Sequence, residues 1–91
     1  MQGTRSEHFV LELVDRLMDE TTNTVKIAPT NFNKTEKERI KTGARKLEAR
    51  RLLISTTRHH YIVNPWFFVP QREDQARILI EWHYWRAVKG I

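Results

Sequence analysis

The chain of 91 residues contains no cysteine, and this absence excludes a disulfide framework and any thiolate metal site. Its three glycines form neither a glycine-rich phosphate loop nor a nucleophile elbow. A paired-carboxylate motif is missing too, so the sequence predicts a protein that is not an enzyme and that uses no cofactor. A chain without cysteine is compatible with the reducing cytoplasm, and this is the location that we expect.

Long hydrophobic runs are also absent. No stretch approaches the roughly 18 apolar residues that a membrane span requires, and the segment Met1 to Glu7 lacks the pattern of a signal peptide. Among the four histidines, His59 and His60 are adjacent and the other two lie far away, without a carboxylate at ligand spacing. We therefore expect a soluble intracellular protein without a metal site.

What the chain does have is an uneven distribution of charge. The formal net charge is +5, and 40% of the residues are hydrophobic, enough for one domain with one modest core. Residues 1–33 carry a net charge of −2, residues 34–60 carry +6, and residues 61–91 carry +1. A cationic segment in an otherwise balanced chain is the electrostatic pattern of a protein that binds a polyanion.

The order of apolar and polar residues predicts three helices and three strands. A cap at Ser6 and an apolar row ending at Met18 indicate a first helix, and Pro29 separates a short strand from one helical turn. Asn33 or Thr35 caps a basic helix, and Gly90 ends the last one. The expected elements are helices at 6–20, 34–51 and 71–89, strands at 25–27, 52–56 and 61–64, a turn at 29–32 and a hairpin loop at 57–60.

The helix at 34–51 is amphipathic, with Ile40, Ala44 and Leu47 on its apolar face. On the opposite arc, Arg45 is suited to a bidentate contact with guanine, and Thr42 and Thr35 can reach a base edge or a thymine methyl. Glu38 either reads cytosine or weakens indiscriminate binding. The flanking cations are expected to contact phosphates: Lys34, Arg39, Lys41 and Lys46.

The hairpin that follows carries Arg58, His59 and His60 near its tip, where they can reach phosphate or the minor groove. Alternative interpretations stay open for both elements: the basic arc can be a solvated charged face, and the tip a polar turn in water. Arg50 and Arg51 are favoured at a helix end by the helix dipole whatever the function. The aromatic residues cluster after the basic segment, which indicates packing within the core or against a subunit.

The segment Ile40-x3-Ala44-x2-Leu47-Glu48-x3-Leu52-Leu53-Ile54 resembles the recognition helix and first wing strand of the winged helix-turn-helix superfamily. This resemblance covers residues 6–69. A shorter phrase, Tyr61-Ile-Val-Asn64-Pro65-x2-Phe68, is similar to the second wing strand of winged-helix plasmid replication initiators. Two features depart from the pattern: the segment before the basic helix is too short for a full second helix, and the wing tip has histidines where glycine is usual.

Together these features predict a small α+β winged helix-turn-helix domain, with residues 6–69 as its core and a C-terminal helix at 71–89. The resemblance implies a sequence-specific protein that binds double-stranded DNA in transcriptional regulation or in plasmid or phage replication control, nucleoid-associated when bound. Residues 72–88 are expected to form a homodimer. The alternative is a small phage or plasmid accessory module that uses the same fold and basic face to bind RNA or an acidic protein.

Overall fold

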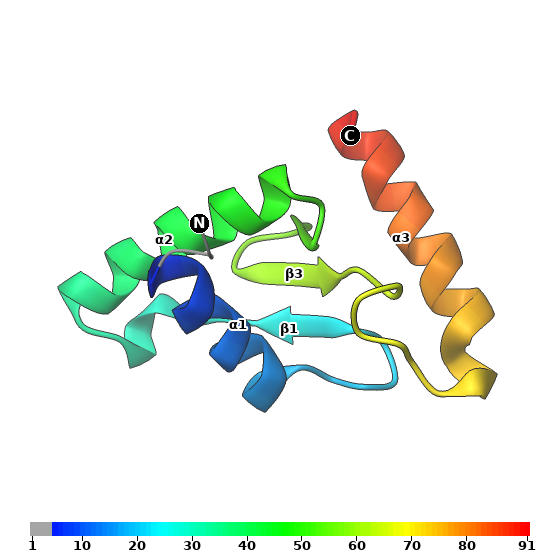
Figure 1. Ribbon diagram of the computed structural model, residues 1–91, viewed down its shortest axis with the longest axis horizontal. Helices are drawn as coiled ribbons and strands as arrows, with labels where there is room; N and C mark the ends of the chain where they lie inside the picture. Colours follow the sequence, from blue (N-terminus) through cyan, green and yellow to red (C-terminus); the bar gives the residue numbers. More distant parts are fainter. Residues whose placement is uncertain (1–4) are drawn as a thin grey trace.

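The computed structural model shows an α+β fold with one antiparallel sheet between helices (Figure 1). The structure describes residues 5–91; residues 1–4, part of the segment without a signal-peptide pattern, lie outside them. The predicted order of elements is confirmed. The elements are α1 (Arg5–Leu17), β1 (Thr24–Lys26), the 3-10 turn η1 (Pro29–Asn31), α2 (Lys34–Ala49), β2 (Leu53–Ser55), β3 (His60–Val63), the 3-10 turn η2 (Arg72–Asp74) and α3 (Gln75–Lys89).

The sheet has the strand order β1-β3-β2, so the strand that comes last in the chain lies in the middle. Val25 pairs with Tyr61 and Leu53 with Val63, while Ile54 pairs with Ile62. Because side chains alternate along a strand, the first two pairs point to one face of the sheet and the third pair to the other. The sheet therefore offers an apolar surface on both sides.

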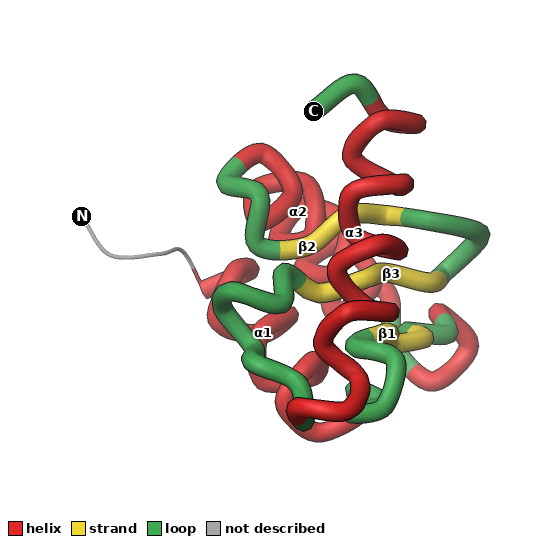
Figure 2. Tube along the Cα trace, turned by 90° about the vertical axis from the view of Figure 1, so that its right-hand side faces the viewer, coloured by secondary structure: helices red, strands yellow, loops and turns green. Residues whose placement is uncertain are grey.

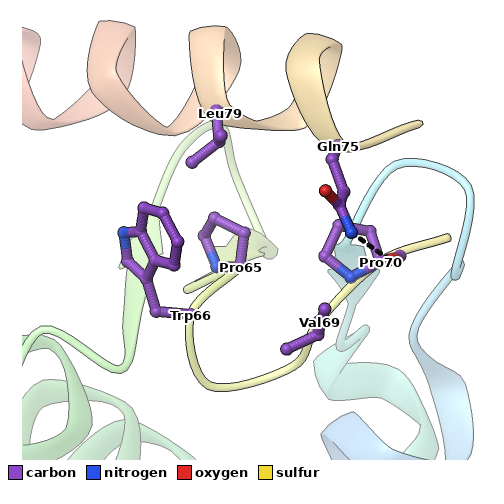
Figure 3. Close-up of a pocket in the computed structure, with 6 residues that line it drawn as sticks. All are labelled: Pro65, Trp66, Val69, Pro70, Gln75 and Leu79. Carbon is purple, nitrogen blue, oxygen red and sulfur yellow. Dashed lines mark hydrogen bonds between the residues drawn. The ribbon is translucent and has the colours of Figure 1, made fainter. Parts of the chain in front are cut away.

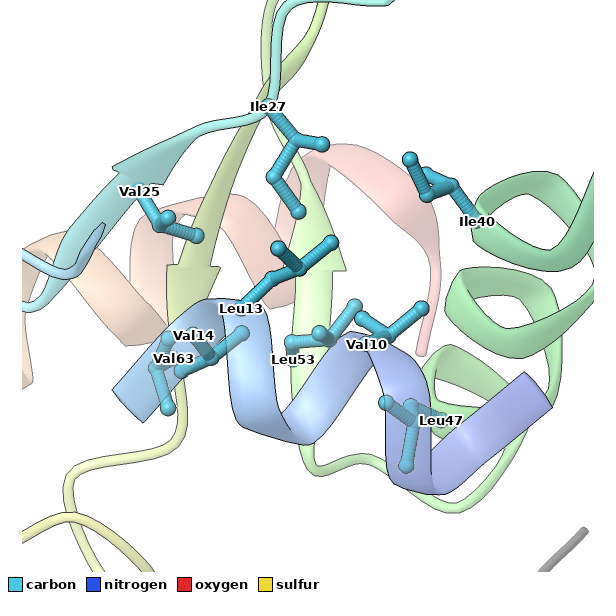
Figure 4. Packing of buried hydrophobic residues seen from close by; sticks show 9 residues of the cluster. All are labelled: Val10, Leu13, Val14, Val25, Ile27, Ile40, Leu47, Leu53 and Val63. Atoms are coloured by element: carbon cyan, nitrogen blue, oxygen red, sulfur yellow. The ribbon is translucent and has the colours of Figure 1, made fainter. Parts of the chain in front are cut away.

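Helices α1 and α2 cover the first face and form the larger core with it (Figure 4). The two helices approach most closely at Gly43, where a Cβ atom would lie 2.2 Å from the carbonyl oxygen of Ser6. Only glycine allows this approach, because the clash would be with backbone. The buried residues of this core are Val10, Leu13, Val14, Val25, Ile27, Ile40, Leu47, Leu53 and Val63.

Helix α3 covers the second face, and Figure 2 shows it crossing in front of the strands with α1 and α2 behind them. Trp82 is 2% exposed and packs with Ile54 and Ile62, and Trp85 lies against the same cluster. The left-handed Gly90 (φ 70°) ends the helix as predicted. Among the described residues, no helix is long and apolar enough to cross a membrane.

The predicted boundaries are wrong at the start of α3 and at the end of α1. Helix α3 begins at Gln75 and not at residue 71, because Arg72–Asp74 form the separate 3-10 turn η2. The second difference lies in α1. The helix ends at Leu17 and not at residue 20, because the Asp19 carboxylate accepts hydrogen bonds from the backbone N–H and the hydroxyl of Thr21. Asp19 also forms an isolated bridge with Thr24, which directs the chain into β1. Ser6, predicted to cap the helix, lies inside it.

In the segment between β1 and α2, residues 27–33, the only helical residues are the three of η1, so the segment is too short for a full second helix, as predicted. Phe32 closes this segment by packing edge-on against Phe9 of α1, with ring centroids 6.3 Å apart. Asn33 then begins α2 in a capping box: its side chain accepts from the backbone N–H of Glu36, whose carboxylate accepts from the backbone N–H of Asn33. Of the two predicted caps, Asn33 is the one that the structure uses.

Candidate nucleic-acid interface

Helix α2 turns a polar face to solvent, because its apolar residues are used against α1 and the sheet. Ile40, Ala44 and Leu47 are buried, as the spacing predicted, and Gly43 is buried beside them. The outward positions named from the sequence are accessible. Thr42 and Lys46 are half-buried, and the exposed ones are Lys34, Thr35, Glu38, Arg39, Lys41 and Arg45.

The hairpin between β2 and β3 stands beside this helix and is held at its tip. The backbone N–H of His60 donates to the carbonyl of Thr57 at 3.0 Å, which closes the turn, and Ile27 donates to the carbonyl of His59 at 2.9 Å. Arg58 is exposed, whereas both histidines are half-buried. His59 has a φ of 65°, so it occupies the left-handed position for which glycine is the usual residue.

A hollow of about 290 Å³ separates the first half of α2 from the hairpin tip. Lys37 and Lys41 of α2 and His59 of the hairpin line it, together with Ile27, Pro29, Ile40 and Tyr61. Two lysines and an imidazole from separate elements therefore border one concave surface with an apolar floor. The structure thus brings together two residues predicted from different segments, Lys41 and His59.

Lys37 was missed by sequence reasoning, although the signal was present. It lies one turn before Lys41, so the two lysines share an edge of α2. The predicted arc was centred opposite Ile40, and Lys37 falls nearer to the apolar side than that arc extends. In the folded protein the hairpin tip lies beside this edge of α2, so Lys37 lines the same hollow as His59.

Glu48 fixes the position of the hairpin relative to α2. Its carboxylate accepts a hydrogen bond from the backbone N–H of Ser55 in β2 at 3.1 Å. Burial and the negative charge of Glu48 both raise the pKa of the Tyr61 phenol, so the phenol stays neutral under ordinary conditions. Through these contacts the strands of the hairpin are attached to the end of the basic helix.

Arg45 lies in a different environment from Lys41. It lines a second hollow of about 490 Å³ with Arg51, Lys89, Gly90 and Ile91, among other residues. Lys89 lies 4.0 Å from the Glu48 carboxylate, so the end of α3 borders the second half of α2. Arg45 is therefore exposed but stands beside the C-terminal end of α3, which adds Lys89 to the cationic surface.

The two arginines at the end of α2 have separate roles. Arg50 donates to the carboxylate of Glu7 at 2.8 Å, and Glu7 is 5% exposed. This ion pair ties α2 to α1 and offsets part of the positive charge of Arg50. Arg51 is exposed in the left-handed region (φ 60°), and its backbone N–H donates to the carbonyl of Glu48.

A third hollow, of about 170 Å³, lies between α3 and the loop after β3 (Figure 3). Its lining consists of Pro65, Trp66, Val69, Pro70, Leu79 and Gln75, whose amide donates to the carbonyl of Pro70 at 3.3 Å. None of these side chains is ionisable, so the hollow offers no acid, base or nucleophile. Within residues 5–91, no group of three or more histidine, aspartate or glutamate side chains could hold a metal ion.

Comparison with known proteins gives no relative. No protein-family model, no curated protein and no solved structure matches this chain. The geometry of the surface formed by α2 and the hairpin is therefore the basis for assigning a function.

Proposed function

We propose that the chain is a winged-helix domain that binds double-stranded DNA at a specific sequence, and that it acts in transcriptional regulation or in plasmid or phage replication control. One observation carries this proposal: Lys37 and Lys41 of the exposed helix face and His59 of the hairpin tip border the same hollow. Two lysines from a helix and an imidazole from an adjoining ribbon on one surface match the way in which winged helices contact the duplex.

The dimensions of α2 suit a major groove. Its 16 residues extend about 24 Å at 1.5 Å per residue, and a groove about 12 Å wide admits a single helix. In this arrangement Arg45, Thr42 and Thr35 face base edges and Glu38 faces cytosine or discourages other sequences. The remaining lysines, arginines and histidines contact phosphates and set the register: Lys34, Lys37, Arg39, Lys41, Lys46, Arg58, His59 and His60.

The decisive experiment measures affinity for random duplex DNA as salt is raised from about 50 to about 200 mM. Each phosphate contact adds about 0.9 to the negative slope of log K against log salt. The double variant Lys37→Ala/Lys41→Ala should lower the magnitude of that slope by about 2. Arg16→Ala, an exposed arginine on α1, is the matched control and should leave the slope unchanged.

The proposal would be contradicted by an absence of binding at low salt, or by a slope that Lys37→Ala/Lys41→Ala changes no more than Arg16→Ala does. Either result would favour the accessory module that binds an acidic protein. The same titration with duplex RNA separates the two nucleic acids. Selection from a random duplex library then supplies the site. On that site Arg45→Ala should lose sequence preference while keeping weak background binding; a variant that keeps its selectivity would exclude Arg45 from base recognition.

A further inference from the structure

The outer face of α3 carries a row of apolar residues that none of residues 5–91 covers. Ile80 is 72% exposed and Tyr84 57% exposed, and Ala76 and Ala87 are exposed on the same side of the helix. We call these four residues the α3 row. Their spacing of four, four and three residues keeps them on one face, opposite the buried Ile78 and Trp82.

We propose that the α3 row is the interface of a homodimer in which two α3 helices pack antiparallel around Ile80. The α3 row lies on the far side of the sheet from α2, so the dimer needs no DNA and leaves the hollow lined by Lys37, Lys41 and His59 free. A second copy of this chain is the occupant that the residues favour. When a second α3 runs antiparallel to the first, large side chains face small ones and basic side chains face acidic ones.

The sizes complement each other about Ile80. In an antiparallel pair with its two-fold axis at Ile80, residues equally far from that position face each other. Ile80 then meets the partner's Ile80, and Tyr84 lies against the partner's Ala76. A large side chain opposite a small one lets the helix axes approach to the 8–10 Å typical of packed helices.

The charges complement each other in the same arrangement. Arg77 and Glu81 flank the row and, with Ile80 and Tyr84, border one shallow hollow. Reversal about Ile80 brings Arg77 within two residues, or about 3 Å along the axis, of the partner's Glu81. Nη2 of Arg77 already donates to the Asp74 carboxylate at 2.6 Å and to the carbonyl of Thr21 at 2.8 Å. The side chain is still 57% exposed, and the other guanidinium nitrogens have donors left for a second carboxylate.

The ends of the helix agree with an antiparallel pair as well. The acidic Glu73 and Asp74 precede α3, and the basic Arg86 and Lys89 lie in its last turn. Antiparallel packing places each acidic end beside the partner's basic end and also opposes the two helix dipoles favourably. A parallel pair would place like charges together at both ends.

The affinity should be modest. One pair of helices buries less than the roughly 1,600 Å² of a standard interface, so we expect a dissociation constant in the micromolar range. Sedimentation velocity of the full chain without DNA, from about 1 to about 300 μM, should show conversion from monomer to dimer. A wild-type chain that stays monomeric over this range overturns the proposal.

Variants locate the interface. Ile80→Glu should raise the dissociation constant more than tenfold, because it buries a charge on the dimer axis. The control Leu17→Glu, which alters a residue 47% exposed on α1, should leave it unchanged. Circular dichroism melts verify that each variant folds, and Tyr84→Gln is the replacement should Ile80→Glu unfold. Dimers that survive both substitutions on α3, or that Leu17→Glu disrupts equally, contradict this interface.

A charge exchange tests the antiparallel direction. Arg77→Glu and Glu81→Arg should each weaken association several-fold by placing like charges opposite each other. The double variant Arg77→Glu/Glu81→Arg should recover most of the lost affinity. Single variants without effect, or a double variant weaker than either single one, would exclude the antiparallel packing.

Discussion

The two faces of the sheet are covered in different ways. On one face α1 and α2 enclose nine buried residues, cross at a glycine and join through the Arg50–Glu7 ion pair. On the other face α3 contributes Trp82 to a cluster of three buried residues, which Ile54 and Ile62 of the strands complete. The outer surfaces differ as well: α2 is charged and α3 is partly apolar. The contrast shows where each side of the domain still has surface for a ligand: a charged one on α2 and a partly apolar one on α3.

The largest effect is expected from Trp82→Ala, which removes the main attachment of α3. Truncating a buried tryptophan costs about 3–5 kcal/mol, and Trp82 is the largest fully buried side chain among the described residues. Chemical denaturation monitored by circular dichroism measures the loss. Trp66→Ala is the control, because this side chain is 71% exposed; equal losses in both variants would show that α3 does not depend on Trp82.

Gly43→Ala tests the opposite face and should have the next largest effect. Alanine improves intrinsic helix propensity by about 1 kcal/mol, but its Cβ would meet the Ser6 carbonyl at 2.2 Å. Forcing the helices apart should cost about 1–3 kcal/mol net. The neighbouring half-buried Thr42→Ala serves as the control in the same urea titration. A more stable Gly43→Ala variant would mean that α1 and α2 can separate without loss.

His59→Gly separates stability from binding at the hairpin tip. Glycine removes the cost of a left-handed φ of 65° and should stabilise the domain by about 0.5–1 kcal/mol. The same change should weaken DNA binding, because it deletes an imidazole from the hollow shared with Lys41. Thermal melts and duplex titrations give the two values. Unchanged affinity would assign His59 to the turn alone.

The smallest effect is expected at Tyr61, whose pKa is raised mainly by burial and to a lesser extent by the negative charge of Glu48. In the unfolded chain the phenol has its ordinary pKa of 10.0. The folded protein favours the neutral phenol, and the free energy of unfolding includes this contribution in full below pH 10.0. It is lost as the pH rises through the higher folded pKa. Melts between about pH 9 and 11 should therefore fall more steeply for the wild type than for Tyr61→Phe; parallel curves would contradict this assignment.

Much of the architecture was predictable because each element has a local signal. The spacing of Ile40, Ala44 and Leu47 predicted the buried face of α2, and Pro29 and Gly90 marked a turn and a helix end that the structure contains. The end of α1 was predicted wrongly: the helix ends three residues before the expected boundary, because the Asp19 side chain accepts the backbone N–H of Thr21. Local signals therefore predict the existence of elements better than their ends.

The candidate site was less predictable, because it depends on contacts between distant segments. A helical period places Arg45 on an outer face but does not reveal that Lys89 and Ile91 stand beside it. The same period places Lys37 close to the apolar side of α2, so it was not predicted to contact DNA. Only the tertiary structure shows that Arg50 is engaged by Glu7, whereas Arg51 remains exposed.

The hydrogen bond from Ile27 to the carbonyl of His59 has a consequence for the energetics of recognition. This hydrogen bond holds the hairpin tip in place in the free protein. The entropic cost of immobilising the tip therefore arises during folding and not when DNA binds. Complex formation should accordingly lack the large heat-capacity decrement of coupled folding and binding. Calorimetry at several temperatures would reveal such rigid-body docking.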